Sequence, residues 1–321
     1  MKIAVSAKEP QLVLKKKRGT RIQRISRALN RGKYCYLMLL PVIAYYLIFH
    51  YWPMLGIAVA FQDYVPGSGF LSGPWIGFKH FTEFFHSFYF WRLIRNTFLL
   101  NFWLLVFSFP APILLALLLN EIRFSWFKRT VQMVTYVPHF ISIIIIVGLI
   151  KDFLATDGVV NLIRHWLGYD SVPLLQFSQF FRTIYVSSDI WQSIGWSSII
   201  YFAAMSAVNP NLYEAAEIDG AGRFSKMWHV TLPAIRPTIV ILLILAIGSM
   251  MSAGFEKVLL LYQPLTYQTA DVISTYVFRK GIENSSFSFA TAVGLFDTVV
   301  NFTLLIMANY FSRKYSENSL W

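Results

Sequence analysis

Six long apolar stretches, separated by shorter polar segments, dominate the pattern of hydrophobic and polar positions along the chain. They cover residues 34–61, 93–119, 131–150, 184–208, 238–261 and 289–310. A helix needs about 20 mostly apolar residues to cross the hydrocarbon core of a bilayer, so each stretch predicts a membrane-spanning helix. The pattern therefore predicts an all-α membrane protein with six transmembrane helices.

The fourth stretch is the least apolar of the six, because Asp189, Gln192 and several serines interrupt it. Such a span is expected to face protein or a water-filled cavity, since lipid offers its polar groups no partners. In the second stretch, Pro110 and Pro112 predict a kink, because proline frees backbone carbonyls of the preceding turn.

The composition agrees with a membrane location. Hydrophobic residues make up 56% of the 321 positions and charged residues 14%, whereas about a quarter of a soluble domain is charged. The net charge is +12, and 11 of the 28 Lys and Arg residues lie in the first 33 positions, where no aromatic residue occurs. Without aromatic side chains to stack on bases, this segment favours a cytoplasmic anchor beside anionic lipid over nucleic-acid binding.

The basic residues also predict the orientation. With a cytoplasmic N-terminus, 19 of the 28 Lys and Arg residues lie before the first span, in the loops 120–130 and 209–237, and in the C-terminal tail. Cytoplasmic segments carry such an excess, so both termini are expected inside. The expected organisation is a basic cytoplasmic segment 1–33, a transmembrane domain 34–312 and a cytoplasmic tail 313–321, with external loops 62–92, 151–183 and 262–288.

The loop between the fourth and fifth spans carries strong local signals. Asn209 followed by Pro210 predicts a helix start, with a capping side chain and then a residue whose missing donor does no harm. Gly220 is expected to end that helix, and a second helical stretch follows over 223–232 until Pro233. The segment 209–237 therefore predicts two short helices joined by a bend on the cytoplasmic surface.

The same loop contains a spaced motif. Glu-Ala-Ala is followed by glycine after three residues, then after nine residues by an aliphatic residue, one further residue and Leu-Pro. These positions are Glu214, Ala215, Ala216, Gly220, Val230, Leu232 and Pro233. The motif resembles the coupling loop of binding-protein-dependent importer permeases, and Asp219 before the glycine with Ala221 after it resembles the sugar-importer branch of that family.

The C-terminal third extends the resemblance. The segments 255–256, 271–277 and 290–296 resemble permeases for oligosaccharides and polysaccharides, including alginate-type importers. The Gly-Gly-Pro turn of maltose-type relatives is replaced here by 262–267, which fits the polysaccharide–oligosaccharide branch and weakens the transfer of residues from the maltose site.

The resemblance implies the fold and the assembly. It implies a type I ABC importer permease fold in a bacterial inner membrane, with sugar delivered by an external or periplasmic binding protein. The implied partners are a second homologous permease, forming a heterodimer, and a dimeric cytoplasmic ATPase. ATP and Mg would act in that ATPase, because this chain has no Gly-x-x-x-x-Gly-Lys-Ser/Thr loop. No catalytic residues, cofactor or metal site are expected, since the six histidines lack metal-ligand spacing.

The resemblance also implies the residues that couple transport to ATP hydrolysis. Glu214 is expected to contact the ATPase, Gly220 to permit the bend, and the two small alanines to allow close helix approach. The full set comprises Glu214, Ala215, Ala216, Asp219, Gly220, Arg223, Leu232 and Pro233. For Glu214 the alternative is a helix-dipole partner on a solvated loop, and for Arg223 it is ordinary cytoplasmic charge.

Polar and aromatic residues inside the spans are candidates for the substrate path, because buried polar groups in a membrane are costly. They are Asp189, Trp191, Gln192, Trp196, Glu256, Asp297 and Asn301. Asp297 and Asn301 are four residues apart and share a helix face, and the tryptophans could stack on sugar rings or pack between helices. For an anionic sugar the better candidates are Arg92, Arg95, Arg182 and Lys257.

Three other functions fit part of the pattern. An ion-coupled secondary transporter would have a self-sufficient chain, usually with more spans and a midplane ion site. An ABC permease for another small solute would share the loop motif, and a receptor or scaffold would use the loop only to bind a partner. ATP-dependent uptake of sugar would separate these alternatives.

Overall fold

The computed structural model describes residues 32–67, 69, 72–252 and 254–315. Most of the basic segment 1–33 and of the tail 313–321 therefore lies outside the described residues. The chain divides into two compact units, Met1–Gly56 and Ile57–Trp321. Most of the described residues are helical, and an isolated bridge between Gln62 and Trp75 is their one β-type pairing.

The first unit contains the first predicted span. Helix α2 (Lys33–Tyr46) continues through the π-helical turn η1 (Leu47–Tyr51) into α3 (Trp52–Met54). The 3-10 turn η2 (Leu55–Phe61) follows and carries the chain into the second unit. This run is long and apolar enough to cross a membrane over Lys33–Phe61, close to the predicted 34–61.

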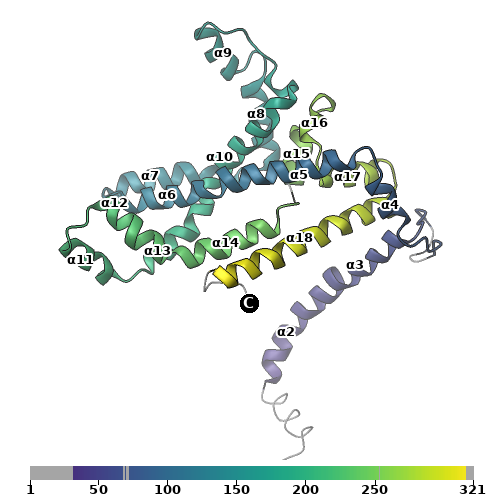
Figure 1. The fold of residues 1–321 in the computed structure, drawn as a ribbon, viewed down its shortest axis with the longest axis horizontal. Coiled ribbons are helices and arrows are strands. Elements are labelled where there is room, and N and C mark those ends of the chain that lie inside the picture. Colours follow the sequence, from purple (N-terminus) through teal and green to yellow (C-terminus); the bar gives the residue numbers. More distant parts are fainter. Residues whose placement is uncertain (1–31, 68, 70–71, 253, 316–321) are drawn as a thin grey trace, which may run out of the picture. The chain divides into compact units, whose positions relative to one another are not determined.

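The second unit contains the remaining helices, which are labelled in Figure 1 and whose short π or 3-10 turns are written η. Its first half contains α4 (Lys79–Phe85), α5 (Phe90–Trp103), η3 (Leu104–Ser108), α6 (Pro110–Glu121), α7 (Ser125–Tyr136), η4 (Val137–Phe140), α8 (Ile143–Leu154), α9 (Val159–Trp166), η5 (Leu174–Gln176) and α10 (Ser178–Ser206). Its second half contains α11 (Pro210–Ile218), α12 (Arg223–Lys226), η6 (Met227–Thr231), α13 (Leu232–Ala234), α14 (Arg236–Gly248), α15 (Phe255–Leu261), η7 (Pro264–Thr266), α16 (Tyr267–Ala270), α17 (Ile273–Phe278), η8 (Arg279–Glu283) and α18 (Phe287–Tyr315).

By length and apolar composition, three helical runs in the described residues can cross a membrane: Lys33–Phe61, Phe90–Glu121 and Phe287–Lys314. Two bent pairs raise the number to five if each counts as one span. Helix α10, at 29 residues, is long enough to cross as well, but its polar residues keep it below the same apolar criterion. The count of six spans therefore stays a prediction.

Two predicted spans are interrupted rather than continuous. The third, predicted over 131–150, bends by 103° between the runs Ser125–Phe140 and Ile143–Trp166. The 3-10 turn η4 with Pro138, followed by extended backbone at Ile141, separates the two runs. The fifth, predicted over 238–261, breaks between α14 and α15. Ser249, Ser252 and Gly254 lie at the break, and serine and glycine are weaker helix formers than alanine.

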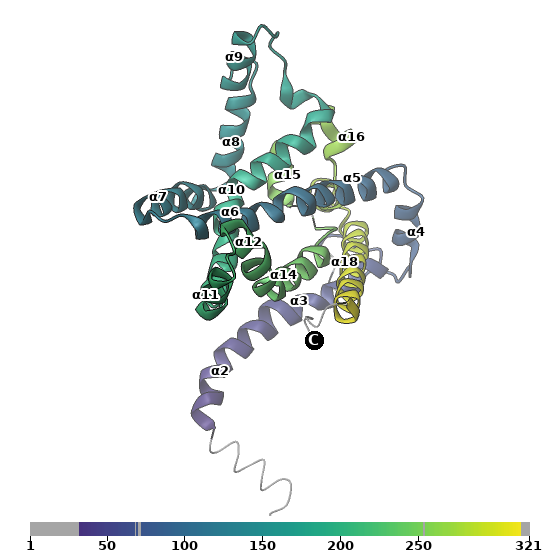
Figure 2. The ribbon, with the colours of Figure 1, turned by 60° about the vertical axis from the view of Figure 1, so that its left-hand side comes forward.

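Helix α10 is the centre of the second unit. It packs along α6 and α7 and also contacts α5, α14 and α16, while α14 lies along α18 (Figures 1 and 2). One apolar core joins α10 to α8 and α15 around Ile146, Tyr185 and Val258. A second joins α4 to α17 and α18 around Phe84. The α11–α13 segment lies at the end of this unit opposite α16 and α17 (Figures 1 and 2).

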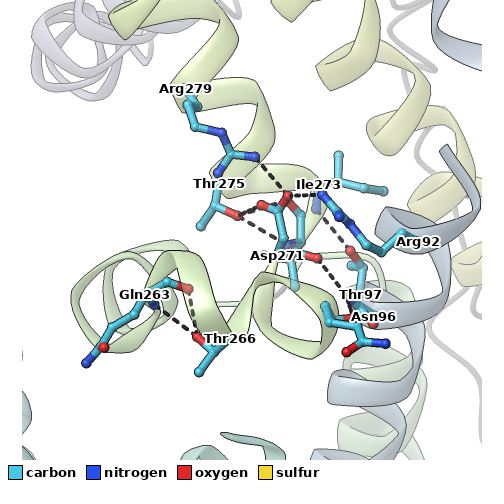
Figure 3. A network of polar contacts seen from close by, with 11 residues as sticks. Arg92, Asn96, Thr97, Gln263, Thr266, Asp271, Ile273, Thr275 and Arg279 are labelled. Atoms are coloured by element: carbon cyan, nitrogen blue, oxygen red, sulfur yellow. Dashed lines mark hydrogen bonds and ion pairs between the residues drawn. The ribbon is translucent and has the colours of Figure 1, made fainter. Parts of the chain in front are cut away.

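A buried carboxylate holds the start of α5 against the segment that enters α17 (Figure 3). Asp271 is fully buried, and its carboxylate accepts from Arg92 at 3.2 Å and from Arg279 at 2.8 Å. Its other oxygen accepts from the Thr275 hydroxyl at 3.1 Å. On α5, the Asn96 amide donates to the Asp271 carbonyl at 3.1 Å. This network joins elements that are more than 170 residues apart in the sequence.

We predict that Asp271→Asn lowers the stability of the folded protein strongly. Removing one partner of a buried ion pair costs about 3–5 kcal/mol, because the remaining charge stays buried and uncompensated. Here two guanidinium groups lose their carboxylate. The melting temperature of the purified protein in detergent measures the loss.

The matched control is Glu83→Gln, the same carboxylate-to-amide change at a side chain that is 49% exposed and paired with His80. An exposed pair contributes about 0–1 kcal/mol, so this variant should melt close to the wild type. Equal melting temperatures for the two variants would contradict the structural importance of Asp271.

Candidate functional site

The segment from α11 to α13 folds as a helical hairpin, and its first helix starts as the sequence predicts. The Asn209 side chain accepts from the Asn211 backbone amide at 3.0 Å, and Pro210 occupies the first helical position. The cap supplies an acceptor to one of the amides that a helix start leaves unpaired. The predicted helix start at Asn209 is confirmed.

The bend depends on a glycine. Gly220 has φ of +77°, a left-handed conformation that residues with a side chain adopt only at a cost. The Ala221 amide donates to the Ala216 carbonyl at 2.8 Å and the Gly220 amide to the Glu217 carbonyl at 3.0 Å, which closes the end of α11. The second helical run reaches Ala234, just beyond the predicted stop at Pro233, and bends by 61° into α14.

Two side-chain contacts fix the two helical arms of the hairpin to each other. The Tyr213 hydroxyl lies 3.0 Å from the Thr231 hydroxyl oxygen. Lys226 donates to the Glu217 carboxylate, and this hydrogen bond lowers the pKa of Glu217 below its ordinary value of 4.5. Two non-covalent contacts, one of them an ion pair whose glutamate is 66% exposed, therefore link the two arms of the hairpin.

The hairpin presents a mixed apolar and charged surface. Ile218 is 86% exposed, Phe224 81% and Trp228 63%. Of the predicted coupling residues, those with exposed side chains or backbone are Glu214, Ala215, Asp219, Gly220, Arg223 and Pro233, while Ala216 and Leu232 are half-buried. Ile218 was not among the predicted residues. Its position between two acids at the end of a helix is nevertheless a sequence signal for an exposed apolar contact residue. Exposed large apolar side chains of this kind are typical of a protein contact surface.

A second candidate site is the break between α14 and α15. At the break, the Met251 backbone amide donates to the Asn301 side-chain oxygen at 2.8 Å, and the Asn301 amide donates to the Ser252 hydroxyl at 3.0 Å. Broken helices in membranes are tolerated where such groups supply the missing hydrogen bonds. Asn301, predicted for the substrate path, is therefore occupied in holding the break.

A charge pair between a buried lysine and a half-buried aspartate joins α15 to α10 next to the break. Asp189 of α10 accepts from the Ser108 hydroxyl at 2.6 Å and lies 3.9 Å from the Lys257 ammonium of α15. Lys257 is 5% exposed, and its nitrogen lies 5.3 Å from the centre of the Tyr185 ring. A side chain at Gly254 would meet the Tyr185 hydroxyl at 2.7 Å, so the close approach of the chain to α10 requires glycine. Two predicted residues, Asp189 and Lys257, are thus paired with each other.

Two cavities reach the break from different sides. Trp196 lines one of about 450 Å³ together with Ser108 and Ser249, and its ring stacks on His139 at 4.7 Å between centres. Asp297 lines the other, of about 680 Å³.

The second cavity contains unpaired polar atoms. Asp297 and Ser274 line it, and their Oδ1 and Oγ atoms lie buried behind its surface with no hydrogen-bond partner among the described residues. Phe255 and Phe278 also line it, with ring centres 5.3 Å apart. Aromatic faces beside unpaired oxygens suit a ligand with hydroxyl groups and an apolar ring face.

The remaining predicted path residues lie apart from these cavities. Trp191 lines a separate pocket of about 360 Å³ with Phe153 and Ser187. Gln192 is half-buried in α10, and Glu256 is exposed in the first turn of α15. The structure thus brings Asp189, Trp196, Asp297 and Asn301 around the break. Glu256 follows the break directly in the chain with an exposed side chain, and Trp191 and Gln192 line neither of the two cavities.

The chain has clear relatives of known sequence. The profile described as "Binding-protein-dependent transport system inner membrane component" matches residues 108–317. Protein LplB of Bacillus subtilis (strain 168) is 46% identical over 92% of this chain and 93% of its own length. The polygalacturonan/rhamnogalacturonan transport system permease protein YteP of the same organism is 45% identical over 91% of this chain and 92% of its own length.

Solved structures resemble this fold closely. The crystal structure of a bacterial ABC transporter involved in the import of the acidic polysaccharide alginate contains a chain with a TM-score of 0.86 and 45% identity, covering 91% of this chain and 99% of that chain. A crystal structure of bacterial alginate ABC transporter in complex with alginate pentasaccharide-bound periplasmic protein gives a TM-score of 0.86 and 44% identity, covering 92% and 100%. The predicted type I importer permease fold is confirmed.

We predict that Lys257→Met and Asp189→Asn are each strongly destabilising. The double variant should lose less stability than the sum of the two single losses. Each single change leaves one charged group without its partner, either the buried Lys257 ammonium or the half-buried Asp189 carboxylate. Leaving the buried ammonium unpaired costs about 3–5 kcal/mol, whereas the double change removes both charges. Melting temperatures of the four proteins in detergent test the coupling. Lys151→Met, at an exposed lysine, serves as the control, and additive effects of the two changes would contradict the pairing.

We predict a pH dependence of the Glu217–Lys226 contact. The pKa of Glu217 is lowered, so the contact stabilises the hairpin above the ordinary pKa of 4.5 and is lost as the pH falls through the lowered pKa. Carbon-13 NMR titration of the glutamate carboxyls measures this value. In Lys226→Gln the pKa of Glu217 should rise toward its ordinary value, whereas Arg223→Gln should leave it lowered. An unchanged titration in Lys226→Gln would disprove the contact.

Proposed function

Since the chain belongs to the family of binding-protein-dependent transport system inner membrane components, we propose that it is the transmembrane permease subunit of an ATP-driven sugar importer. Its substrate is an oligosaccharide or polysaccharide, and an acidic one, as in the relatives for polygalacturonan/rhamnogalacturonan and for alginate. The single observation that carries the proposal is the exposed, rigid hairpin with Glu214 on α11 and the left-handed Gly220 at its bend. An ion-coupled carrier would have no need of such a hairpin.

The proposed assembly contains four kinds of component. This chain pairs with a second homologous permease in a bacterial inner membrane, with both termini in the cytoplasm. A dimeric ATPase binds the hairpin and supplies the ATP and Mg chemistry, and a periplasmic or external binding protein delivers the sugar. The neighbouring alginate transporter in complex with its sugar-bound periplasmic protein supports the last of these partners.

In the proposed mechanism, the hairpin transmits the movement of the ATPase. Glu214 and Arg223 contact the ATPase through charge, and Ile218, Phe224 and Trp228 add apolar area at the same surface. ATP closes the ATPase dimer, and the hairpin moves with its subunit because the Glu217–Lys226 and Tyr213–Thr231 contacts prevent its arms from separating.

The proposed substrate path passes the break between α14 and α15. Trp196 offers an aromatic face in one cavity, and Asp297 offers an unpaired carboxylate oxygen in the other. Asp189 and Asn301 keep the walls of the path in place through their contacts with Ser108 and Met251. Trp191, Gln192 and Glu256 remain in the proposal as residues that the sugar contacts at other points along the path.

We predict that Glu214→Lys abolishes ATP-driven sugar uptake. The substitution reverses a charge at the proposed ATPase contact, and like charges across an interface cost several kcal/mol. Uptake and ATPase activity are measured with the assembled transporter and its binding protein in proteoliposomes, and co-purification of the ATPase is scored by mass spectrometry.

The control is Asp157→Lys, the same charge reversal at an exposed acid outside the hairpin. It should retain uptake. Normal uptake and coupled ATPase activity in Glu214→Lys would refute the coupling role of the hairpin, and uptake without ATP would favour an ion-coupled carrier.

A further inference from the structure

Positive charge exceeds negative charge where α5, α10 and η8 meet. Asp271 compensates Arg92 and Arg279. Of the described residues, none places a carboxylate within 4.0 Å of Arg95 or Arg182. Asp271 therefore neutralises Arg92 and Arg279, whereas Arg95 and Arg182 have no counter-ion among the described residues.

The two uncompensated arginines repel each other. Burial is the larger unfavourable influence on the charged guanidinium of Arg182, and the charge of the exposed Arg95 adds to it. Like charges held together in a partly desolvated place cost free energy unless an anion lies close to both. Such an arrangement is typical of an anion-binding site.

Arg182 is also held in a fixed orientation. Its Nη2 donates to the Asn96 side-chain oxygen at 3.1 Å, and Asn96 is fully buried, with its amide donating to the Gln268 and Asp271 carbonyls. The Arg182 Nε is buried and has no acceptor among the described residues. A long side chain that merely reaches toward lipid headgroups would not need this support.

The fixed guanidinium lines a cavity with an aromatic wall. The cavity has about 450 Å³, and Trp103 and Phe107 line it with stacked rings whose centres are 5.6 Å apart. Thr183 and Ser187 contribute hydroxyl groups to the same cavity. It thus combines a flat apolar surface, hydrogen-bonding hydroxyls and a guanidinium that can bind a carboxylate.

We infer that this cavity, which we call the Arg182 pocket, binds a uronate unit of the transported sugar. The sugar ring lies against Trp103 and Phe107, and its carboxylate lies on Arg182, with Arg95 adding a second positive charge. A uronate has both the flat C–H face and the carboxylate that the pocket matches. A neutral sugar has no carboxylate. The inference rests on the proposed sugar transport and adds to it the residues that recognise the acid group.

The test measures binding of sugar to the assembled transporter without its binding protein, so that selectivity of the binding protein has no influence. The transporter is placed in nanodiscs of phosphatidylcholine. The probes are an oligogalacturonate and the same oligosaccharide with its carboxylates reduced to hydroxymethyl groups, and Kd is measured for each.

We predict that the wild type binds the acidic probe more tightly than the reduced one. A hydrogen bond to a charged group is worth about 1.5–3 kcal/mol, so Arg182→Gln should weaken binding of the acidic probe about tenfold or more and leave the reduced probe unaffected. Arg182→Lys should retain part of the preference, because it keeps the charge but loses the planar fork.

Two further variants protect the test against misfolding. Arg182→Gln removes a contact between α5 and α10, whereas Arg95→Gln changes an exposed side chain and should fold normally while losing part of the acid preference. Arg164→Gln removes an arginine of α9 that donates to the Asp170 carbonyl, away from the pocket, and should bind like the wild type.

Three outcomes would overturn the inference. Equal Kd values for the two probes, or unchanged Kd values in both Arg95→Gln and Arg182→Gln, would show that the pocket does not recognise the acid group. Displacement of the acidic probe by phosphatidylglycerol in the nanodisc at low mole fraction would assign the pocket to a lipid headgroup. Uptake by the wild type with its binding protein is measured in proteoliposomes made from the same purified transporter, and only its absence would count against sugar transport itself.

Discussion

Hydrocarbon offers no hydrogen-bond partner to a polar group, and this constraint accounts for the polar contacts inside the helical bundle. The break between α14 and α15 frees backbone groups, and Asn301 of α18 satisfies the Met251 amide there. At the π-helical turn η3, Ser108 donates to Asp189 of α10. At these two places a side chain from a neighbouring helix contacts the interrupted segment, so both irregular places are also where helices are tied together.

The hairpin and the break are connected by a single short helix. The second arm of the hairpin leads directly into α14, whose 13 residues end at the break. At about 1.5 Å per residue, this helix is about 20 Å long, so it can transmit a movement of the hairpin over that distance into the bundle. The chain therefore offers a covalent path from the proposed ATPase contact to the proposed substrate path, and the bend before α14 and the break after it are the two places where the path can pivot.

Charges inside the second unit follow two different patterns. Asp271 with two arginines, and Asp189 with Lys257, are compensated and link helices. Arg95 and Arg182 are not compensated by any described carboxylate, and Arg182 lines an aromatic cavity. Compensated charge fixes structure, because neither partner gains from a further ion. An uncompensated charge at a fixed position can bind a counter-ion, and an acidic sugar carries a carboxylate that can serve as one.

What the sequence by itself determined was local. Asn209, Pro210 and Gly220 define the hairpin because a cap, a first-turn proline and a left-handed glycine depend only on their near neighbours in the chain. The apolar stretches defined the first, second and last spans for the same reason.

Only the tertiary structure decided which polar groups meet. Asp189 and Lys257 are 68 positions apart, and Asp271 and Arg92 are 179 apart, so hydropathy cannot pair them. It also decided that the third and fifth stretches bend or break. An apolar run is equally apolar whether straight or interrupted, and an interruption persists only where neighbouring helices supply the hydrogen bonds that the helix gives up.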